Sequence, residues 1–141
     1  VDNEMVTALS TAAKSGVDVR IVTPHIPDKW YVHAVTRAYY ETLLQNGVRI
    51  YEYTPGFIHA KTFVVDDEYG TVGTINLDYR SLYLHFECGV WLCRTRSVLQ
   101  IKEDVLAMLP VCQEITLEQC QHVPWYRKLG RACLRIFAPL M

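Results

Sequence analysis

A histidine and a lysine two positions apart are the residues of this sequence best suited to chemistry at phosphorus. His59 and Lys61 stand in one apolar stretch, and Gly73, Thr74 and Asn76 end the next. Side chains two apart in a strand share a face, so we expect the imidazole and the ammonium group to project together. The Thr74 hydroxyl and the Asn76 amide offer neutral donors from a neighbouring strand end. This set suits a tetrahedral oxyanion and requires neither a metal nor another cofactor.

Three further residues are candidates for supporting roles. Gly73 lets the backbone approach a ligand closely. Glu87, on a later apolar stretch, is placed to hold an imidazole in one tautomer and to stabilise its charged form. Asp66 heads an Asp-Asp-Glu turn, so a catalytic role and a structural role that bonds the turn amides are both open.

The elements that must position these residues follow from apolar periodicity and from turn residues. Helices are predicted from Asn3 to the stop at Gly16, over 30–45 and over 97–109, with a short one after Thr116. Strands are predicted over 17–22, 48–53, 57–66, 70–75 and 86–93. The early strand, helix, strand order predicts a parallel pair with ligands beyond its carboxyl ends. His25 lies in the 23–29 loop at that edge, where it either lines a ligand pocket or is an ordinary loop residue.

Composition limits the function classes. The chain has 141 residues, 50% of them hydrophobic, and a net charge of −1, so its overall charge does not predict a nucleic-acid binder. Five cysteines without CxxC spacing predict reduced thiols, with Cys88 and Cys93 buried on a strand. Val1 and the lack of a charged-then-apolar leader suggest a fragment without a signal peptide, and no apolar run approaches the ~18 residues of a membrane span.

The spacing of the polar residues matches the phospholipase D signature HxK(x)4D(x)6G(S/T)xN in full, at His59, Lys61, Asp66, Gly73, Thr74 and Asn76. The segments 73–81, 85–92 and 23–29 resemble bacterial cardiolipin synthases in particular. The resemblance implies an α/β fold, a phospholipase D-like α/β/α sandwich with a mixed, mostly parallel sheet flanked by helices. It assigns residues 1–124 to a catalytic half-domain and 125–141 to a carboxy-terminal basic helix.

The resemblance also implies a reaction. Two HxK motifs meet at one site: one histidine attacks a phosphodiester to form a phosphohistidine, and the other protonates the departing glycerol and then deprotonates the incoming hydroxyl. His59, Lys61 and Asp66 are the expected catalytic residues, with Lys61, Thr74 and Asn76 binding phosphate. As a carboxy-terminal motif, His59 is expected to be the acid and base, although the nucleophile role stays open.

The implied substrate is phosphatidylglycerol, and the implied location is the cytoplasmic face of a bacterial membrane. Only one HxK motif is present, so the chain is expected to need the amino-terminal half of a longer enzyme or a second copy of itself. A homodimeric nuclease of the same superfamily and a non-catalytic dimerisation or membrane-docking module are the alternatives. Nucleic acid is not an expected partner, because apolar and aromatic residues rather than basic ones surround His59.

The carboxy-terminal segment is a further candidate for lipid contact. Its basic residues share one side of a predicted helix over 125–137, opposite an apolar side; they are Arg127, Lys128, Arg131 and Arg135. Such a helix either lies on an anionic bilayer surface or packs on the domain with its basic side solvated.

Overall fold

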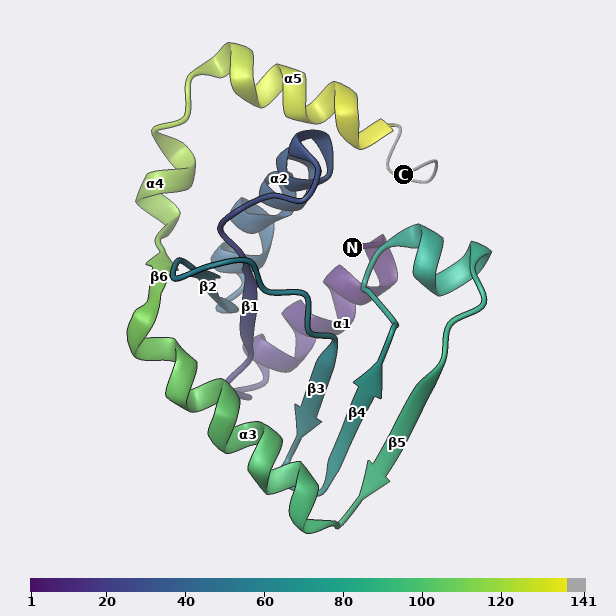
Figure 1. Cartoon of the computed structure of the whole chain (residues 1–141). Helices are drawn as coiled ribbons and strands as arrows, with labels where there is room; N and C mark the ends of the chain where they lie inside the picture. The colour runs from purple at the N-terminus through teal and green to yellow at the C-terminus, as the bar shows by residue number, and fades with distance from the viewer. Residues whose placement is uncertain (137–141) are drawn as a thin grey trace.

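The chain forms helices and strands in an α/β arrangement (Figure 1). The structure, a computed structural model, describes residues 1–136, without the side chains of 127, 128, 131, 135 and 136. In chain order the helices are α1 (Asn3–Lys14), α2 (Trp30–Gln45), α3 (Arg96–Met108), α4 (Leu117–Gln121) and α5 (Trp125–Ile136). The strands are β1 (Arg20–Pro24), β2 (Arg49–Tyr53), β3 (Thr62–Val65), β4 (Tyr69–Gly73), β5 (Gly89–Cys93) and β6 (Cys112–Ile115). A π-helical turn covers Arg80–Leu84, and a 3₁₀ turn covers Leu109–Val111.

The first sheet has the strand order β1-β2-β6. Strands β1 and β2 are parallel, with Arg20 opposite Arg49, which confirms the crossover predicted through α2. Strand β6 was not predicted; it pairs antiparallel with β2, with Ile115 opposite Ile50. Its sequence, Cys-Gln-Glu-Ile, has two exposed polar residues at its centre and so lacks the apolar run of the other strands.

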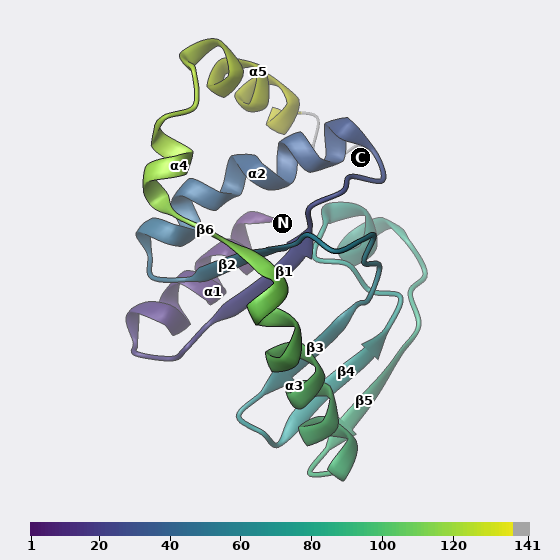
Figure 2. The same ribbon diagram turned by 60° about the vertical axis from the view of Figure 1, so that its left-hand side comes forward.

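The second sheet, β3-β4-β5, is antiparallel throughout. The α/β class is confirmed, but the expectation of a mostly parallel sheet is wrong, because β1 and β2 form the parallel pair and the other described pairings are antiparallel. The physical reason is the short β3–β4 connection, since a parallel pair needs a longer crossover. In both views the β3 side of this sheet lies beside β1 of the first sheet (Figures 1 and 2).

The main core lies between α2 and the first sheet. Val35, Tyr39 and Leu43 of α2 are buried with Val48 and Ile50 at the start of β2. Apolar residues of α1 complete this cluster, which are Val6, Leu9 and Ala13. Each fully buried aliphatic side chain contributes roughly 1.5–3 kcal/mol relative to exposure. This packing fixes α2 over β2 and so fixes the loops that leave the carboxyl ends of β1 and β2.

Helix α3 packs on the second sheet through Val98, which is fully buried. Strand β5 is an edge strand of that sheet, and Val90 and Trp91 are exposed on it although they point to opposite faces. Cys88 and Cys93 are exposed as well, so the prediction that they are buried was wrong. The strand period alone does not reveal that β5 has no neighbouring strand on its outer side within residues 1–136.

Helix α5 packs on α2, and Leu134 contacts the core from it. Trp125, Tyr126 and Leu129 are exposed on the same helix. The predicted basic side and the segment 137–141 lie outside the described residues. Among the helices that the structure describes, none has the length and apolar character of a bilayer span.

Candidate active site

His59 lies in the extended segment that joins β2 to β3. Its ring is exposed and stacks on the ring of Phe57, with 5.7 Å between centroids and 20° between planes. The prediction that 57–66 is one strand was therefore wrong at its start, because β3 begins at Thr62. Strand β4 ends at Gly73, so the segment before Lys61 has no ladder partner to make it a strand.

Lys61 is half-buried at the amino end of β3. Its backbone carbonyl accepts a hydrogen bond from the Gly73 amide at 3.3 Å, which extends the β3–β4 pairing by one position. Its Nζ donates to the His59 carbonyl oxygen at 3.0 Å. The ammonium group thus lies over the backbone of the HxK segment, and its other protons remain available to further acceptors.

Thr74 and Glu87 form a second polar pair at the same end of the sheet. The Thr74 hydroxyl donates to the Glu87 carboxylate and accepts from the Cys88 amide at 3.1 Å, while the Thr74 amide donates to the Cys88 carbonyl at 2.9 Å. The hydrogen bond from Thr74 lowers the pKa of Glu87, and Ser81 and the charge of Lys61 act in the same direction. Glu87 is therefore held ionised, in the form that can accept a hydrogen bond from an imidazole N–H.

These bonds change the expected role of Thr74. Its hydroxyl proton is directed to Glu87 rather than into open space, so the geometry gives Thr74 the task of orienting a carboxylate. Asn76 is exposed and follows β4 by three residues, at the sheet end that also carries Lys61. Both expected neutral phosphate donors, Thr74 and Asn76, are exposed, but Asn76 has no such commitment among the described contacts.

Gly73 sits where β4 and β5 approach most closely. A Cβ at this position would lie 2.3 Å from the Cys88 carbonyl oxygen and 2.6 Å from the Gly89 Cα. No side chain larger than hydrogen fits between these strands without moving them. The glycine therefore keeps Thr74 within hydrogen-bond distance of Glu87.

Asp66 lies at the other end of β3, roughly 15 Å along the strand from Lys61 at the usual rise per residue. Asp66 and Asp67 have φ values of 52° and 59°, and the Glu68 amide donates to the Val65 carbonyl at 3.2 Å. Positive φ at both central residues is the geometry of a hairpin turn, which aspartate tolerates better than most residues. Asp66 thus lies in a hairpin turn at the far end of β3 from Lys61, and its expected catalytic role with His59 stays a prediction.

The segment before Glu87 is anchored to the start of α1. Tyr83 of the π-helical turn donates to the carboxylate of Asp2, which is buried and also accepts from the Met5 amide at 2.8 Å. The bond to Asp2 is the main reason that the pKa of Tyr83 rises to about 12. This contact fixes the path along which the chain enters β5.

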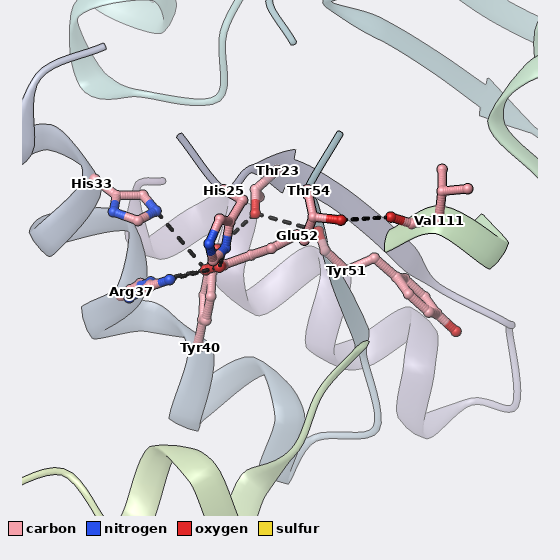
Figure 3. Close-up of polar contacts among 9 residues, drawn as sticks. All are labelled: Thr23, His25, His33, Arg37, Tyr40, Tyr51, Glu52, Thr54 and Val111. Carbon is pink, nitrogen blue, oxygen red and sulfur yellow. Dashed lines mark hydrogen bonds and ion pairs between the residues drawn. The ribbon is translucent and has the colours of Figure 1, made fainter. Parts of the chain in front are cut away.

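A second polar cluster, centred on Glu52, lies at the carboxyl ends of β1 and β2 (Figure 3). Glu52 is fully buried, and its carboxylate accepts from Arg37 Nε at 2.8 Å and Arg37 Nη2 at 2.6 Å. The Tyr40 hydroxyl donates to it at 3.2 Å, and His25 Nδ1 lies 2.8 Å from Oε2. His33 Nε2 is 3.9 Å from Oε1 and has no hydrogen-bond partner within the described part of the chain.

Burial and the charge of Arg37 determine which groups of this cluster are ionised. Burial by itself raises the pKa of Glu52, but the hydrogen bonds from Arg37 and His25 outweigh it and hold that pKa below its ordinary value. The bond with Glu52 raises the pKa of Arg37. Burial, helped by the nearby Arg37 charge, lowers the pKa of His33. The centre of the cluster is thus a carboxylate and guanidinium pair beside a neutral His33.

Sequence reasoning did not identify this cluster, although one signal was present. Val48, Ile50 and Glu52 alternate along β2 and are 1%, 1% and 0% exposed. A glutamate in the register of two core positions requires a buried partner. Arg37 supplies that partner from α2, and His33 of the same helix is the neighbour that lacks a hydrogen bond at Nε2 among the described residues.

The crystal structure of Nuc, a phospholipase D family member from Salmonella typhimurium, matches with a TM-score of 0.71 over 82% of this chain and 76% of that one, at 18% sequence identity. The fold is therefore the phospholipase D fold.

Sequence similarity identifies the family within this fold. The family described as cardiolipin synthase, PLD-like domain, matches residues 1–109, and the chain belongs to that family. It is 41% identical over 140 residues to a cardiolipin synthase of Halalkalibacterium halodurans, covering 99% of this chain and 28% of that protein. An uncharacterised protein of Streptococcus mutans is 45% identical over 141 residues, which are 31% of its length. The chain thus spans less than a third of these relatives.

Proposed function

We propose that this chain supplies one of the two HxK motifs of a phosphatidyltransferase that forms cardiolipin and glycerol from two phosphatidylglycerol molecules. The observation that carries the proposal is the arrangement of residues at the end of the β3-β4-β5 sheet where β3 begins and β4 ends. Lys61 and Gly73 are joined there by a backbone bond, the adjoining Thr74 holds Glu87, and His59 immediately precedes the Ala60-Lys61 pair. The family membership and the relatives named cardiolipin synthase support the lipid substrate.

In the proposed reaction, one motif's histidine attacks the phosphodiester and forms a phosphohistidine while glycerol departs. His59 is the acid and base: it gives a proton to the departing glycerol oxygen and takes one from the incoming hydroxyl. Glu87, ionised and oriented by Thr74, stabilises the imidazolium form of a histidine at this site. Lys61 and Asn76 bind the non-bridging oxygens of the phosphate.

The second motif comes from the amino-terminal part of a longer protein or from a second copy of this chain. The surface beside Glu87 supports such a partner. Phe86, Val90 and Trp91 are large apolar residues exposed around it, and one edge of β5 has no strand partner in the described part of the chain. Exposed apolar surface of this kind marks an interaction site in many proteins.

Contact with an anionic membrane surface is part of the same proposal. The exposed Trp125, Tyr126 and Leu129 on α5 are residue types that enter the interfacial region of a bilayer. Leu134 contacts the core, which places this apolar face away from the domain. Liposome co-sedimentation of the chain with and without anionic lipid tests this part of the proposal, with Leu129→Asp as the variant expected to lose binding.

The transfer reaction is tested in two settings. The purified chain is assayed for cardiolipin formation from phosphatidylglycerol and for DNA cleavage, each with His59→Ala as the control. The chain is also exchanged for the segment that it matches in the H. halodurans cardiolipin synthase. Cardiolipin formation that His59→Ala abolishes supports the proposal. DNA cleavage that depends on His59, or a folded chimera that makes cardiolipin equally well without His59, would overturn it.

A further inference from the structure

We propose that His25 is a headgroup-binding residue of this site, and that its Nε2 accepts a hydrogen bond from a glycerol hydroxyl of the acceptor lipid. The inference rests on the proposed function, because it assigns a position for the acceptor in that reaction. The observations behind it come from the Glu52 cluster, whose residues have no role in the transfer reaction proposed above.

The first observation is that the His25 ring is fixed at one nitrogen. Nδ1 lies 2.8 Å from Glu52 Oε2, and the backbone amide of His25 donates to the Tyr53 carbonyl at 3.2 Å. Glu52 cannot turn away, because Arg37 binds both of its oxygens and Tyr40 donates to Oε1. Both the ring and its supporting carboxylate are therefore held in place before any ligand arrives.

The second observation is the state of the other nitrogen. Glu52 is ionised, so the bond between it and Nδ1 requires the proton to be on Nδ1. In the neutral ring Nε2 is then an acceptor, and it has no hydrogen-bond partner among the described residues. The His25 side chain is 42% exposed, whereas that of Glu52 is 0% exposed. A buried carboxylate thus holds a half-exposed imidazole whose outer nitrogen can accept a hydrogen bond from a hydroxyl.

The third observation is position. His25 directly follows β1, and Lys61 directly precedes β3. Strands β1 and β3 run in opposite directions side by side in both views, so the end of one and the start of the other lie at the same edge (Figures 1 and 2). In the proposed reaction the acceptor's glycerol enters where the first glycerol has departed, beside the phosphate bound by Lys61 and Asn76, and His25 lies at this edge.

Two substitutions distinguish a hydroxyl-binding role of His25 from a purely structural one. An asparagine side chain reproduces the position of Nδ1 and lacks an atom at Nε2, whereas a glutamine side chain reproduces Nε2 and lacks Nδ1. If His25 only supports Glu52, then His25→Asn is harmless and His25→Gln is not. If His25 binds the hydroxyl, His25→Gln retains the affinity for glycerol phosphate and His25→Asn lowers it.

The experiment is an NMR titration of the histidine ring resonances of the whole chain with sn-glycerol 3-phosphate, inorganic phosphate and glycerol. His122, which bonds to Glu118 on α4, is an internal reference. We expect glycerol phosphate to shift both His25 and His59, and inorganic phosphate to shift His59 alone. His25→Asn should weaken glycerol phosphate binding about fivefold, the value of one hydrogen bond, with little change for phosphate and an unchanged melting temperature. His25→Gln should stay near the wild-type affinity.

Two different failures are distinguishable. If glycerol phosphate shifts His59 but not His25, or if His25→Asn binds it as tightly as the wild type does, the role of His25 is refuted while the phosphate site stands. If glycerol phosphate shifts neither histidine, the phosphate site is refuted together with this inference. In vesicles, glycerol-headed phospholipid and free glycerol phosphate are then compared as competitors, which separates a lipid headgroup from a soluble phosphate ester.

Discussion

Replacing Gly73 with alanine tests whether the close approach of β4 and β5 builds the site. The added Cβ would lie 2.3 Å from the Cys88 carbonyl oxygen, so the strands must separate by roughly 1 Å to restore an ordinary contact. That shift lengthens the 2.9 Å bond from the Thr74 amide to the same oxygen beyond hydrogen-bond range. Overpacking and the lost bond together should lower the free energy of unfolding by about 2–4 kcal/mol.

The matched control is Gly56→Ala. No described atom lies within 4 Å of a Cβ at Gly56. The free energy of unfolding should therefore change by less than ~1 kcal/mol, and any change should be stabilising. Both variants are measured by urea denaturation, with hydrogen exchange at the Cys88 amide as the local probe. Equal stabilities for the two variants, or unchanged exchange at Cys88 in Gly73→Ala, would refute the reasoning.

Two further predictions concern the polar clusters. Arg37→Met should cost about 3–5 kcal/mol of unfolding free energy because it leaves Glu52 buried without its cation, whereas Arg94→Met, in an exposed pair, should cost less than ~1 kcal/mol. Denaturant midpoints compare the two, and similar costs would contradict the burial argument. Thr74→Val should raise the pKa of Glu87 toward its ordinary value of 4.5. The native bond from Thr74 stabilises the ionised form of Glu87. Its contribution to folding stability is therefore present above pH 4.5 and is lost as the pH falls through the lowered pKa. Carboxyl NMR titration measures the pKa of Glu87, and an unchanged pKa in Thr74→Val would contradict this role of Thr74.

Hydrophobic periodicity was sufficient to predict the most regular parts of the fold. Helix α2 has the predicted bounds, 30–45, because its apolar stripe is continuous and Asn46-Gly47 stops it. The parallel pairing of β1 with β2 followed from that helix. The sequence also placed Gly73 and Thr74 at the end of a strand that neighbours the Lys61 segment, although it placed Lys61 inside a strand rather than directly before β3.

Long-range partners were not predictable in the same way. Glu52 looks like an ordinary glutamate until Arg37 is known to reach it from α2. Asp66 belongs to the sequence signature, but the four-residue length of β3 places it at the far end of the strand from Lys61. Sequence spacing shows which residues are near in the chain, whereas strand direction decides which of them share an edge.

The central claim is that the side chains at this sheet end converge on one phosphate-sized space. The most direct measurement is a crystal structure of the chain with tungstate, an anion of phosphate shape that scatters strongly. We expect tungstate to bind within hydrogen-bond distance of His59, Lys61 and Asn76. Tungstate bound elsewhere, or these three side chains pointing away from one another in the same crystals, would contradict it.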